Sequence, residues 1–384
     1  MENSLSFIEK LKNTSSIAAQ EDVGKYLKES KLPLVLYGAG DLARWAKSEL
    51  SRQDIKIDFI SVDKKYWTPD MKFMGIDVLP LDDILQNCDK VNVIVAFICK
   101  NDRETVEMLN KTQKVQRCFL MPTVNVFRPI NRFDSVFLDK NASCLREFYD
   151  NLADDLSCKI LFEYLMAFRT GTLKEITKLM LEHNLIEEKQ YFPDFLALSD
   201  NETYIDCGLF NLGTIEDFLA ETNCKFNKVF GFEPDTSYFI DCKKRLAFYE
   251  TLKGVVNETN VILLEKGVWS KKQTLHFFSN YDCPGSSRIS ETGYTVEVDS
   301  IDNVLGNEKA TFIKMDIEGS ELEALKGTEK QIRDNKPKLA ICVYHKEEDL
   351  ITIPQYILSL NPEYKLYLRH HCSCSFTELV LYAI

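Results

Sequence analysis

Residues 203–384 alternate short apolar runs with segments of helical spacing, and this alternation restricts the fold more than any other feature of the sequence. A chain that repeats strand and helix in this way forms a sheet of mostly parallel strands covered by helices. The apolar runs predict strands at residues 203–205, 229–232, 261–264, 311–315 and 338–343. Helical spacing predicts helices from about residue 214 and over residues 237–252, 322–332 and 353–360.

Two further strands are expected near the C-terminus, over residues 365–369 and 379–382, and a short turn-like stretch joins them. Strands joined in this way form an antiparallel hairpin, which here would close one edge of the sheet. The second half of the chain is therefore predicted to be an α/β domain with seven strands. We place this domain at residues 196–384.

A smaller α/β pattern occupies residues 31–130 and contains a glycine turn. The apolar run Leu34–Tyr37 ends in Gly38-Ala39-Gly40, and the next run ends in Asp63, 23 residues after Gly40. In a dinucleotide fold, such glycines let the backbone approach a pyrophosphate, and the acidic residue binds ribose hydroxyls. A glycine turn can equally serve to pack a helix against a sheet. We predict a Rossmann-like domain here, and both interpretations of its turn stay open.

The residues outside the two α/β patterns have the spacing of helices. Residues 1–30 are predicted to form N-terminal helices, and residues 131–195 a helical connector with apolar residues at steps of three and four. The connector could form a lid or a homodimer surface, or it could simply pack against the second α/β domain. The fold class is thus α/β, with two Rossmann-like domains joined by helices.

Charge and composition exclude several classes of protein. The 384 residues include 47 Lys and Arg against 59 Asp and Glu, a net charge of −12, which disfavours binding to nucleic acid. Charged residues occur within the first ten positions and the longest apolar run is residues 93–99, so we expect a cytoplasmic protein without a membrane span. Twelve cysteines without any CxxC spacing are expected to be reduced thiols.

Acidic residues and glycines gather where the predicted strands of the second half end. These ends carry the motifs YIDCGLFNLGT, FGFEPDTSYF, LLEKGVWS and FIKMDIEGSELEALKG. Glu233 in the second motif follows Gly208 in the first by 25 residues. Because the carboxyl ends of parallel strands meet at one edge of a sheet, we expect these motifs to form a single ligand site.

The second half of the chain, from about residue 200, resembles the FkbM family of S-adenosylmethionine-dependent methyltransferases, which have the class I methyltransferase layout of seven strands with a terminal hairpin. The segments IKMDIEGSELEALKG, KPKLAICVYHKEEDLITIPQYI and YKLYLRHH carry the resemblance. They look like the branch of the family associated with bacterial glycan and polysaccharide modification. The resemblance implies S-adenosylmethionine as the cofactor and O-methylation of a sugar or glycan hydroxyl as the reaction.

The first half resembles the small N-terminal domain of bacterial sugar-modifying proteins, including sugar acyltransferases. The segments VLYGAGDLARW and GIDVLPLDDIL carry this resemblance. It implies a nucleotide, a nucleotide-sugar or a docked partner as the ligand of the N-terminal domain.

The methyltransferase layout implies roles for the strand-end residues. Asp206 and Gly208 would hold the charged amino-acid part of the cofactor, Glu233 would accept both ribose hydroxyls, and Lys266–Val268 would face the adenine ring. The predicted cofactor-binding residues are Asp206, Gly208, Gly213, Glu233, Pro234, Lys266, Gly267, Val268 and Asp316.

The glycine loop departs from the pattern of the family. Methyltransferases of this kind usually have a second glycine four residues after the first, whereas this chain has Leu212 there and Gly213 one place later. A leucine at this point could block the carboxylate of S-adenosylmethionine. The alternative function is therefore a non-catalytic nucleotide-sugar-binding or scaffold protein with a vestigial methyltransferase fold.

Three residues are predicted to take part in catalysis, namely His345, Asp316 and Lys314. His345 follows the fifth strand and can accept a proton near neutral pH, and Asp316 is the second candidate base. His345 could instead cap the next helix, and Asp316 could orient the substrate or the sulfonium. Lys314 could neutralise an anionic substrate or form a structural ion pair.

The residues predicted to contact the acceptor are Glu318, Ser286, Ser287 and His345. The two serines lie in a loop, CPGSSRIS, that could close over the acceptor or be an ordinary loop. Asp316, Glu318 and His345 also offer oxygen and nitrogen atoms that suit a divalent cation. Because a turn begins at Gly319, the segment does not stay extended, and we predict no metal site.

Overall fold

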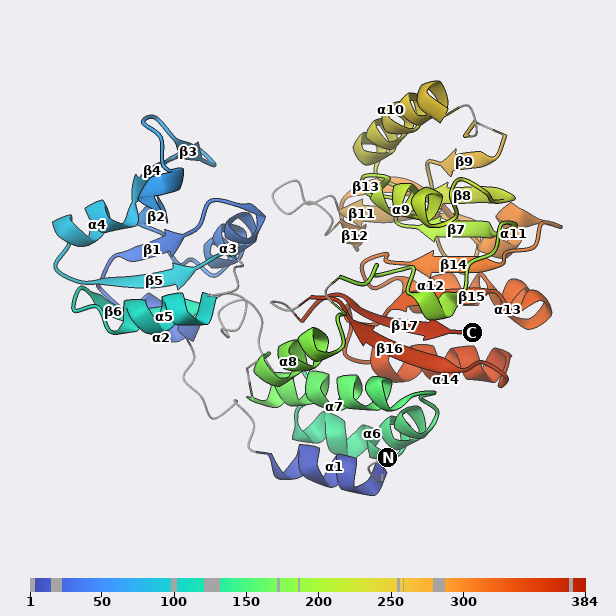
Figure 1. The fold of residues 1–384 in the computed structure, drawn as a ribbon, viewed down its shortest axis with the longest axis horizontal. Helices are drawn as coiled ribbons and strands as arrows, with labels where there is room; N and C mark the ends of the chain where they lie inside the picture. The colour runs from blue at the N-terminus through green and yellow to red at the C-terminus, as the bar shows by residue number, and fades with distance from the viewer. Residues whose placement is uncertain are drawn as a thin grey trace.

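The computed structural model contains a large α/β sheet in each half of the chain and a smaller sheet within the second half (Figure 1). It describes residues 4–14, 23–97, 102–120, 132–170, 173–185, 187–253, 256–257, 259–278, 287–372 and 376–384. Within these ranges, every helix is too short or too polar to cross a membrane.

The C-terminal sheet has seven strands in the order β16-β17-β15-β14-β7-β8-β9. They are β7 (Thr203–Cys207), β8 (Lys228–Phe232), β9 (Val261–Leu264), β14 (Phe312–Met315), β15 (Lys338–Cys342), β16 (Leu366–His370) and β17 (Leu379–Ala383). The first five run parallel, and β17 runs antiparallel to both β15 and β16. This arrangement confirms the predicted seven-stranded α/β fold with a hairpin at one edge.

Helices follow the strands and bury the apolar residues of the sheet. They are α9 (Gly213–Glu221), α10 (Thr236–Lys253), α11 (Ile301–Leu305), α12 (Glu321–Lys326), α13 (Glu329–Asn335) and α14 (Asp349–Leu360). The Tyr204 ring of β7 stacks on Phe218 of α9 and on Phe312 of β14, with ring centroids 4.6 and 5.0 Å apart. Rings of this size bury much apolar area, so they stabilise the centre of the sheet.

A four-stranded sheet that the sequence analysis did not predict lies between β9 and β14 along the chain. Its strands are β10 (Gly267–Val268), β11 (Gln273–Phe278), β12 (Arg288–Ile289) and β13 (Tyr294–Asp299), in the order β10-β13-β11-β12. In β13, the buried Val296 and Val298 flank the exposed Glu297, which is the period of a half-buried strand. This insertion interrupts the strand–helix alternation from which the rest of the domain was predicted.

The N-terminal sheet has six strands in the order β3-β4-β2-β1-β5-β6, and all are parallel except β3. They are β1 (Leu34–Tyr37), β2 (Phe59–Val62), β3 (Lys72–Phe73), β4 (Ile76–Pro80), β5 (Val91–Val95) and β6 (Val115–Leu120). The helices of this half are α2 (Val23–Glu29), α3 (Asp41–Arg52), the short η2 (Lys64–Tyr66), α4 (Leu81–Asn87) and α5 (Asp102–Asn110). Parallel strands linked by helices form a Rossmann-like sheet.

The glycine turn of the N-terminal sheet has a packing reason. A Cβ atom on Gly38 would lie 2.4 Å from the carbonyl oxygen of Ala96, and the φ angle of Gly38 is +138°. Only glycine therefore lets the end of β1 pass so close to the end of β5. The Asp63 carboxylate, expected to face a ribose, accepts a hydrogen bond of 2.5 Å from the Tyr37 hydroxyl. Both contacts favour the packing interpretation of the turn.

The remaining helices are α1 (Ser4–Asn13), α6 (Ser135–Asp150), α7 (Asp155–Thr170), α8 (Lys174–Glu182) and the short η3 (Asp194–Leu196). α1 packs against α6 and α7, with the rings of Phe7 and Tyr149 4.7 Å apart, whereas α2 packs on the N-terminal sheet (Figure 1). The two helices within residues 1–30 thus pack on different halves of the chain. Apolar contacts attach α1 to the C-terminal half.

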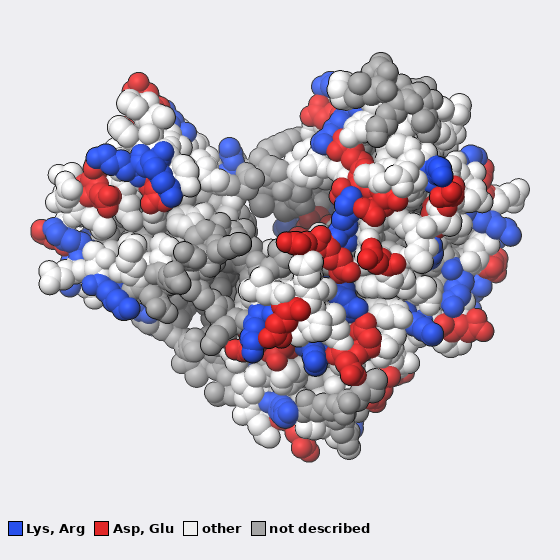
Figure 2. All heavy atoms as spheres, in the orientation of Figure 1, with Lys and Arg blue, Asp and Glu red and all other residues white. Residues whose placement is uncertain are grey.

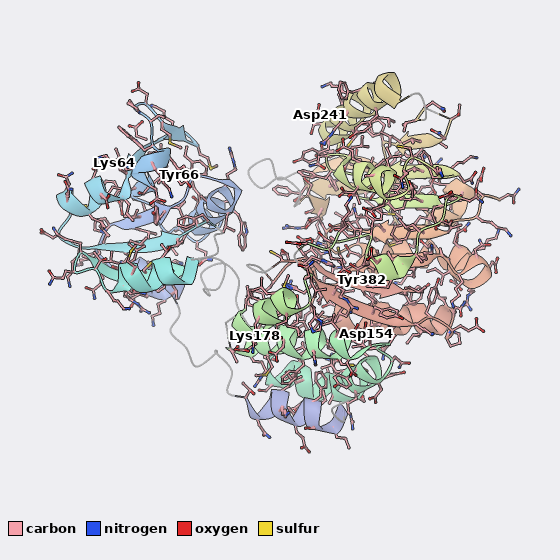
Figure 3. All side chains as sticks on the ribbon, in the orientation of Figure 1. Lys64, Tyr66, Asp154, Lys178, Asp241 and Tyr382 are labelled. Carbon is pink, nitrogen blue, oxygen red and sulfur yellow. The ribbon has the colours of Figure 1, made fainter. Side chains whose placement is uncertain are left out.

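The connector helices lie against the edge hairpin of the C-terminal sheet. Ser157 Oγ of α7 accepts a hydrogen bond of 2.9 Å from the backbone N–H of Leu368 in β16. Asp154, which is labelled in Figure 3 together with Tyr382 of β17, accepts a hydrogen bond of 2.6 Å from Arg369 Nη2. The connector therefore covers the outermost strand of the sheet.

Charged side chains of both signs are mixed over the surface. On the face shown in Figure 2, Lys and Arg side chains of the described residues alternate with Asp and Glu over both halves of the chain.

The backbone at the end of β7 comes close to the end of β14 at Gly208. A Cβ atom there would lie 2.1 Å from the carbonyl oxygen of Asp316, and the φ angle of Gly208 is +94°. Gly208 is thus required by the contact between two strands, whatever ligand binds beside it.

We expect Gly208→Ala to lower the free energy of unfolding by about 2–4 kcal/mol, because it adds backbone strain and a steric contact at once. Urea denaturation followed by circular dichroism measures this loss. Gly40→Ala is the control, since a Cβ on Gly40 meets no atom within 4 Å. Equal free energies of unfolding for Gly208→Ala and Gly40→Ala would contradict the conclusion that the contact between β7 and β14 requires Gly208.

Candidate functional site

The carboxyl ends of β7, β8, β14 and β15 lie side by side at one edge of the seven-stranded sheet, because these four strands are parallel neighbours. Asp206 and Gly208 lie at the end of β7, Glu233 follows β8, Asp316 follows β14 and His345 follows β15. The structure therefore brings these predicted site residues to a single edge.

Lys314 and Asp206 form a buried ion pair at the centre of this edge. Lys314 Nζ lies 3.1 Å from Asp206 Oδ1, and the two side chains are 2% and 0% exposed. The same ammonium donates hydrogen bonds to the carbonyl oxygens of Gly208 at 2.8 Å and Cys207 at 3.3 Å. Burial acts to lower the pKa of Lys314, but Asp206 and Asp316 raise it above its ordinary value. Lys314 is thus a charged group whose ammonium points toward β7. This position favours the alternative in which Lys314 forms a structural ion pair.

Glu233 is held by backbone amides at the end of β8. Its Oε1 accepts a hydrogen bond from the N–H of Asp235 and its Oε2 accepts one from the N–H of Phe210, each at 2.9 Å. Burial raises the pKa of Glu233 to about 7. Because an ionised carboxylate oxygen accepts more than one hydrogen bond, each oxygen retains room for one further donor.

The loop after β7 turns through two non-glycine residues in the left-handed conformation. Phe210 has a φ angle of +48° and Leu212 of +68°. The Leu212 side chain is 1% exposed and packs in the hydrophobic core, and α9 begins at Gly213. This position argues against the obstruction that a leucine here was expected to cause, because the side chain is turned into the core.

Asp316 accepts hydrogen bonds from two tyrosines. The Tyr191 hydroxyl donates to Asp316 Oδ2 at 2.7 Å, and the Tyr344 hydroxyl donates to Oδ1 at 3.3 Å. Burial acts to raise the pKa of Asp316, but Lys314, His345 and the two tyrosines hold it below its ordinary value. Asp316 is therefore an ionised carboxylate, and its side chain retains 24% exposure at the edge.

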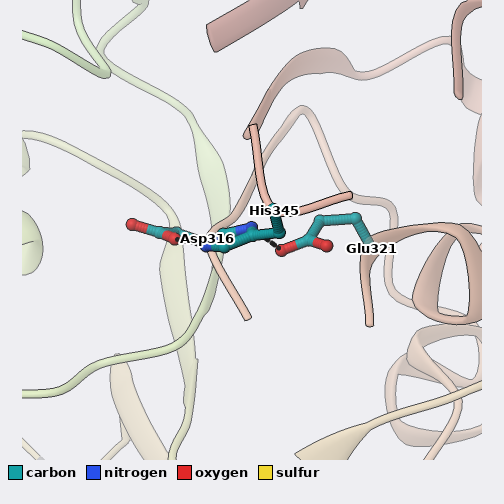
Figure 4. A group of neighbouring side chains, drawn as sticks. All are labelled: Asp316, Glu321 and His345. Atoms are coloured by element: carbon teal, nitrogen blue, oxygen red, sulfur yellow. Dashed lines mark ion pairs between the residues drawn. The ribbon is translucent and has the colours of Figure 1, made fainter. Parts of the chain in front are cut away.

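The His345 ring lies between carboxylates on both of its sides (Figure 4). Its Nδ1 is 3.0 Å from Glu321 Oε1, and its Nε2 is 3.5 Å from Asp316 Oδ1 and 3.7 Å from Glu318 Oε2. Burial acts to lower the pKa of His345, but these three carboxylates raise it to about 9. The ring is thus charged at neutral pH.

The placement of the same groups bears on metal binding. Asp316, Glu321 and His345 each offer a ligand atom, and these atoms lie within 4.8 Å of one another. The shortest contacts of the ring are made by different nitrogens, Nδ1 to Glu321 and Nε2 to Asp316, so the charged ring lies between the two carboxylates. In this arrangement the imidazolium itself balances the negative charge.

The other predicted site residues are placed near the end of β8 or lie outside the described part. Gly267 and Val268 form β10, and a Cβ on Gly267 would lie 3.7 Å from Pro234 Cβ. Lys266 Nζ forms an ion pair of 3.6 Å with Asp299. Ser287 is half-buried, and Ser286 lies outside the described residues.

Three residues of the site were not selected from the sequence: Tyr191, Glu321 and Tyr344. Tyr191 belongs to the connector, 125 residues before its partner Asp316, and no local pattern links the two. Glu321 follows Glu318 in the segment DIEGSE and could have been included as part of that motif. Tyr344 directly precedes His345, and its ring centroid is 4.1 Å from that of the imidazole.

The same stretch of sequence that forms this edge identifies a family. Residues 206–371 match the methyltransferase FkbM domain. This match agrees with the resemblance that the sequence indicated. The match begins at Asp206 of β7 and ends at His371, directly after β16, so the FkbM domain includes all four strand ends described above.

The fold of the whole chain is similar to that of a solved FkbM protein. The crystal structure of methyltransferase FkbM from Methylobacillus flagellatus KT has a TM-score of 0.71 and 20% identity, and the match covers 99% of this chain and 98% of that chain. An rRNA methylase from Streptococcus thermophilus matches 50% of this chain and 90% of its own at 19% identity, with a TM-score of 0.32. A search of the curated proteins finds no match.

We expect Lys314→Met to lower the free energy of unfolding by about 3–5 kcal/mol, because it leaves the buried Asp206 carboxylate without a counter-charge. The double variant Asp206→Asn/Lys314→Met should recover much of this loss, as measured by urea denaturation. Lys326→Met is the control, because Lys326 pairs with Glu323 on the surface. Losses that simply add in the double variant would contradict the pairing.

Proposed function

We propose that this protein is an S-adenosylmethionine-dependent O-methyltransferase that acts on a sugar or glycan hydroxyl in bacterial polysaccharide or glycan modification. The observation that carries the proposal is the placement of Glu233, Asp316 and His345 along one edge of an FkbM domain. Such an edge, where parallel strands end, is where ligands bind in open α/β sheets.

The residues at the end of β8 suit the cofactor. The two Glu233 oxygens are fixed by backbone amides and can each accept one hydroxyl of a ribose. Lys266–Val268, beside Pro234, would border the adenine, and the loop from Gly208 to Gly213 would border the amino-acid part. When bound, S-adenosylmethionine would supply an electrophilic methyl group.

His345 and Asp316 are the groups that can take the proton of an acceptor hydroxyl. The hydroxyl oxygen loses this proton as it gains the methyl group, so a base beside it favours the reaction. His345 is the stronger base of the two in its neutral form, which becomes populated as the pH rises toward the ring's pKa of about 9, whereas the pKa of Asp316 is lowered. Asp316 would then orient the acceptor.

The charge of the edge supports an acceptor without phosphate or carboxylate groups. Asp316, Glu318 and Glu321 surround His345, and Lys314 is already paired with Asp206. An anionic acceptor would be repelled by the ionised Asp316 carboxylate, whereas sugar hydroxyls can donate hydrogen bonds to the oxygens of these side chains. Glu318 and Ser287 are the residues that we propose for acceptor binding.

The N-terminal domain and the compartment are further parts of the proposal. We propose that the N-terminal sheet binds a nucleotide-sugar or docks a partner, and that the protein acts in the reducing cytoplasm. The second point is supported by the buried free cysteines among the described residues, which are Cys118, Cys158, Cys207, Cys242 and Cys342.

A non-catalytic scaffold is the alternative function, and cofactor binding decides between the two. We expect S-adenosylhomocysteine to bind the wild-type protein in isothermal titration calorimetry. Absence of any binding heat, together with absence of methyl transfer to a panel of sugars and glycans, would support the scaffold.

Two alanine variants should separate binding from chemistry. We expect Glu233→Ala to weaken S-adenosylhomocysteine binding by about 100-fold or more, because two hydrogen bonds to a charged group are lost. We expect His345→Ala to lower kcat by about 100- to 10,000-fold, as for loss of a general base, with the cofactor affinity unchanged. Full activity of the histidine variant would move the base to Asp316.

Cofactor affinity should depend on pH through Glu233. The pKa of about 7 means that this carboxyl takes up a proton as the pH falls through 7 and loses an acceptor site. We expect the affinity for S-adenosylhomocysteine to fall about tenfold between pH 8 and pH 6, measured by calorimetry. Glu233→Gln should bind more weakly and with little dependence on pH over this range.

A further inference from the structure

Glu321 places a carboxylate in the interior of the protein. It is fully buried at the first position of α12. Its Oε1 accepts hydrogen bonds from the backbone N–H groups of Ile317 at 2.9 Å and Gly319 at 3.4 Å. These amides belong to the turn that follows Asp316, so the turn itself fixes the position of the carboxylate.

The same oxygen of Glu321 meets the imidazole of His345. The distance between Glu321 Oε1 and His345 Nδ1 is 3.0 Å, and the ring is 9% exposed. A carboxylate at this distance favours the proton on Nδ1, as in other carboxylate–histidine pairs. The second nitrogen, Nε2, is thereby directed toward Asp316 and Glu318, the two side chains of the cluster that retain partial exposure.

The backbone that carries His345 is fixed independently of Glu321. Arg132 donates from Nη1 to the carbonyl oxygen of Tyr344 at 2.7 Å and from Nη2 to that of His345 at 2.6 Å. The remaining freedom of the residue is rotation of its ring, and a flip of the ring about the Cβ–Cγ bond would put carbon atoms in the places of the two nitrogens. The contact with Glu321 selects between these two orientations.

We infer that Glu321 is a positioning residue that holds His345 with Nδ1 protonated and Nε2 facing the reacting hydroxyl. This inference rests on the proposed methyl transfer for its catalytic meaning, but the orientation of the ring can be tested alone. A carboxylate behind the ring also stabilises the imidazolium that forms when Nε2 takes a proton.

Several charged groups act on the ring besides Glu321. Asp316 and Glu318 face Nε2 from the turn after β14, Asp349 approaches from α14, and Glu378 approaches from the segment before β17. Of these, Glu321 is the carboxylate closest to a ring nitrogen, so its loss should change the affinity of the ring for a proton most.

The first test is nuclear magnetic resonance of the full chain labelled with ¹⁵N-histidine. The five histidines give separable signals, and His345→Gln assigns the one of interest. In the wild-type protein we expect the neutral form of His345 to carry its proton on Nδ1. In Glu321→Gln we expect the midpoint of titration to fall by one pH unit or more, a tenfold loss in proton affinity.

The second test is the pH dependence of kcat. Turnover should rise with pH as His345 loses its proton, and Glu321→Gln should shift this rise to lower pH while reducing the plateau. A residue that merely supported the fold would lower kcat at every pH without moving the midpoint. Glu323→Gln is the matched control on the same helix, because Glu323 pairs with Lys326 at the surface.

Glu321→Asp keeps the charge but withdraws the carboxylate by one methylene, so it serves if the glutamine variant does not fold. We expect a smaller shift of the titration in the same direction. An unchanged midpoint in a folded Glu321 variant, or a neutral ring with its proton on Nε2, would overturn the inference. Failure of S-adenosylhomocysteine to bind, with the expected titrations observed, would refute the proposed function and leave the orientation of His345 established.

Discussion

The ion pair between Lys314 and Asp206 is the interaction on which the rest of the site depends. Two charged groups that are both removed from water are tolerated only because each offsets the other and because the ammonium also donates hydrogen bonds to two carbonyl oxygens. Lys314 also binds two carbonyl oxygens at the end of β7, so it ties β14 to β7 where Gly208 lets the two strands approach. Asp316 lies two residues after Lys314 in the chain, so the contacts that hold Lys314 against β7 also place Asp316 at the edge of the sheet.

Beyond this ion pair, the arrangement of side chains at the edge depends on how their negative charge is compensated. Three carboxylates lie within 3.7 Å of a nitrogen of the His345 ring, and this ring is the cation that they share. Burial raises the pKa of Glu318 to about 8, so that carboxyl holds a proton over much of the neutral range. The cluster therefore carries less negative charge than its composition implies, and the ionised Asp316 carboxylate lies beside the charged ring.

The helical connector is part of this site as well as of the fold. Arg132, at its start, fixes the backbone at Tyr344 and His345, and Tyr191, near its end, donates to Asp316. The Tyr191 ring also lies 5.1 Å from the Lys314 ammonium, a distance at which a cation is attracted to an aromatic face. Of the two interpretations of the connector, packing against the second α/β domain describes these contacts.

The sequence by itself determined the order of strands and helices and the residues that follow each strand. Predicted strand 338–343 is β15 (Lys338–Cys342), and the strand pattern alone predicts that Asp316 and His345 lie at the same edge. This prediction was possible because the carboxyl ends of parallel strands all lie at one edge of a sheet. Residues that directly follow such strands in the sequence therefore lie at that edge. The strands of the four-stranded sheet after β9 were not predicted. Burial alternates along them with a period of two, whereas the rest of the domain was predicted from its alternation of strands and helices.

Only the tertiary structure decided which partner each of these side chains has. Lys314 is turned to Asp206, Leu212 is turned into the core, and Glu321 lies behind His345. Tyr191 reaches Asp316 across 125 residues of chain. The physical reason is that local patterns set the backbone conformation, whereas the direction of a buried charged or polar side chain is set by groups from distant segments that compensate its loss of water.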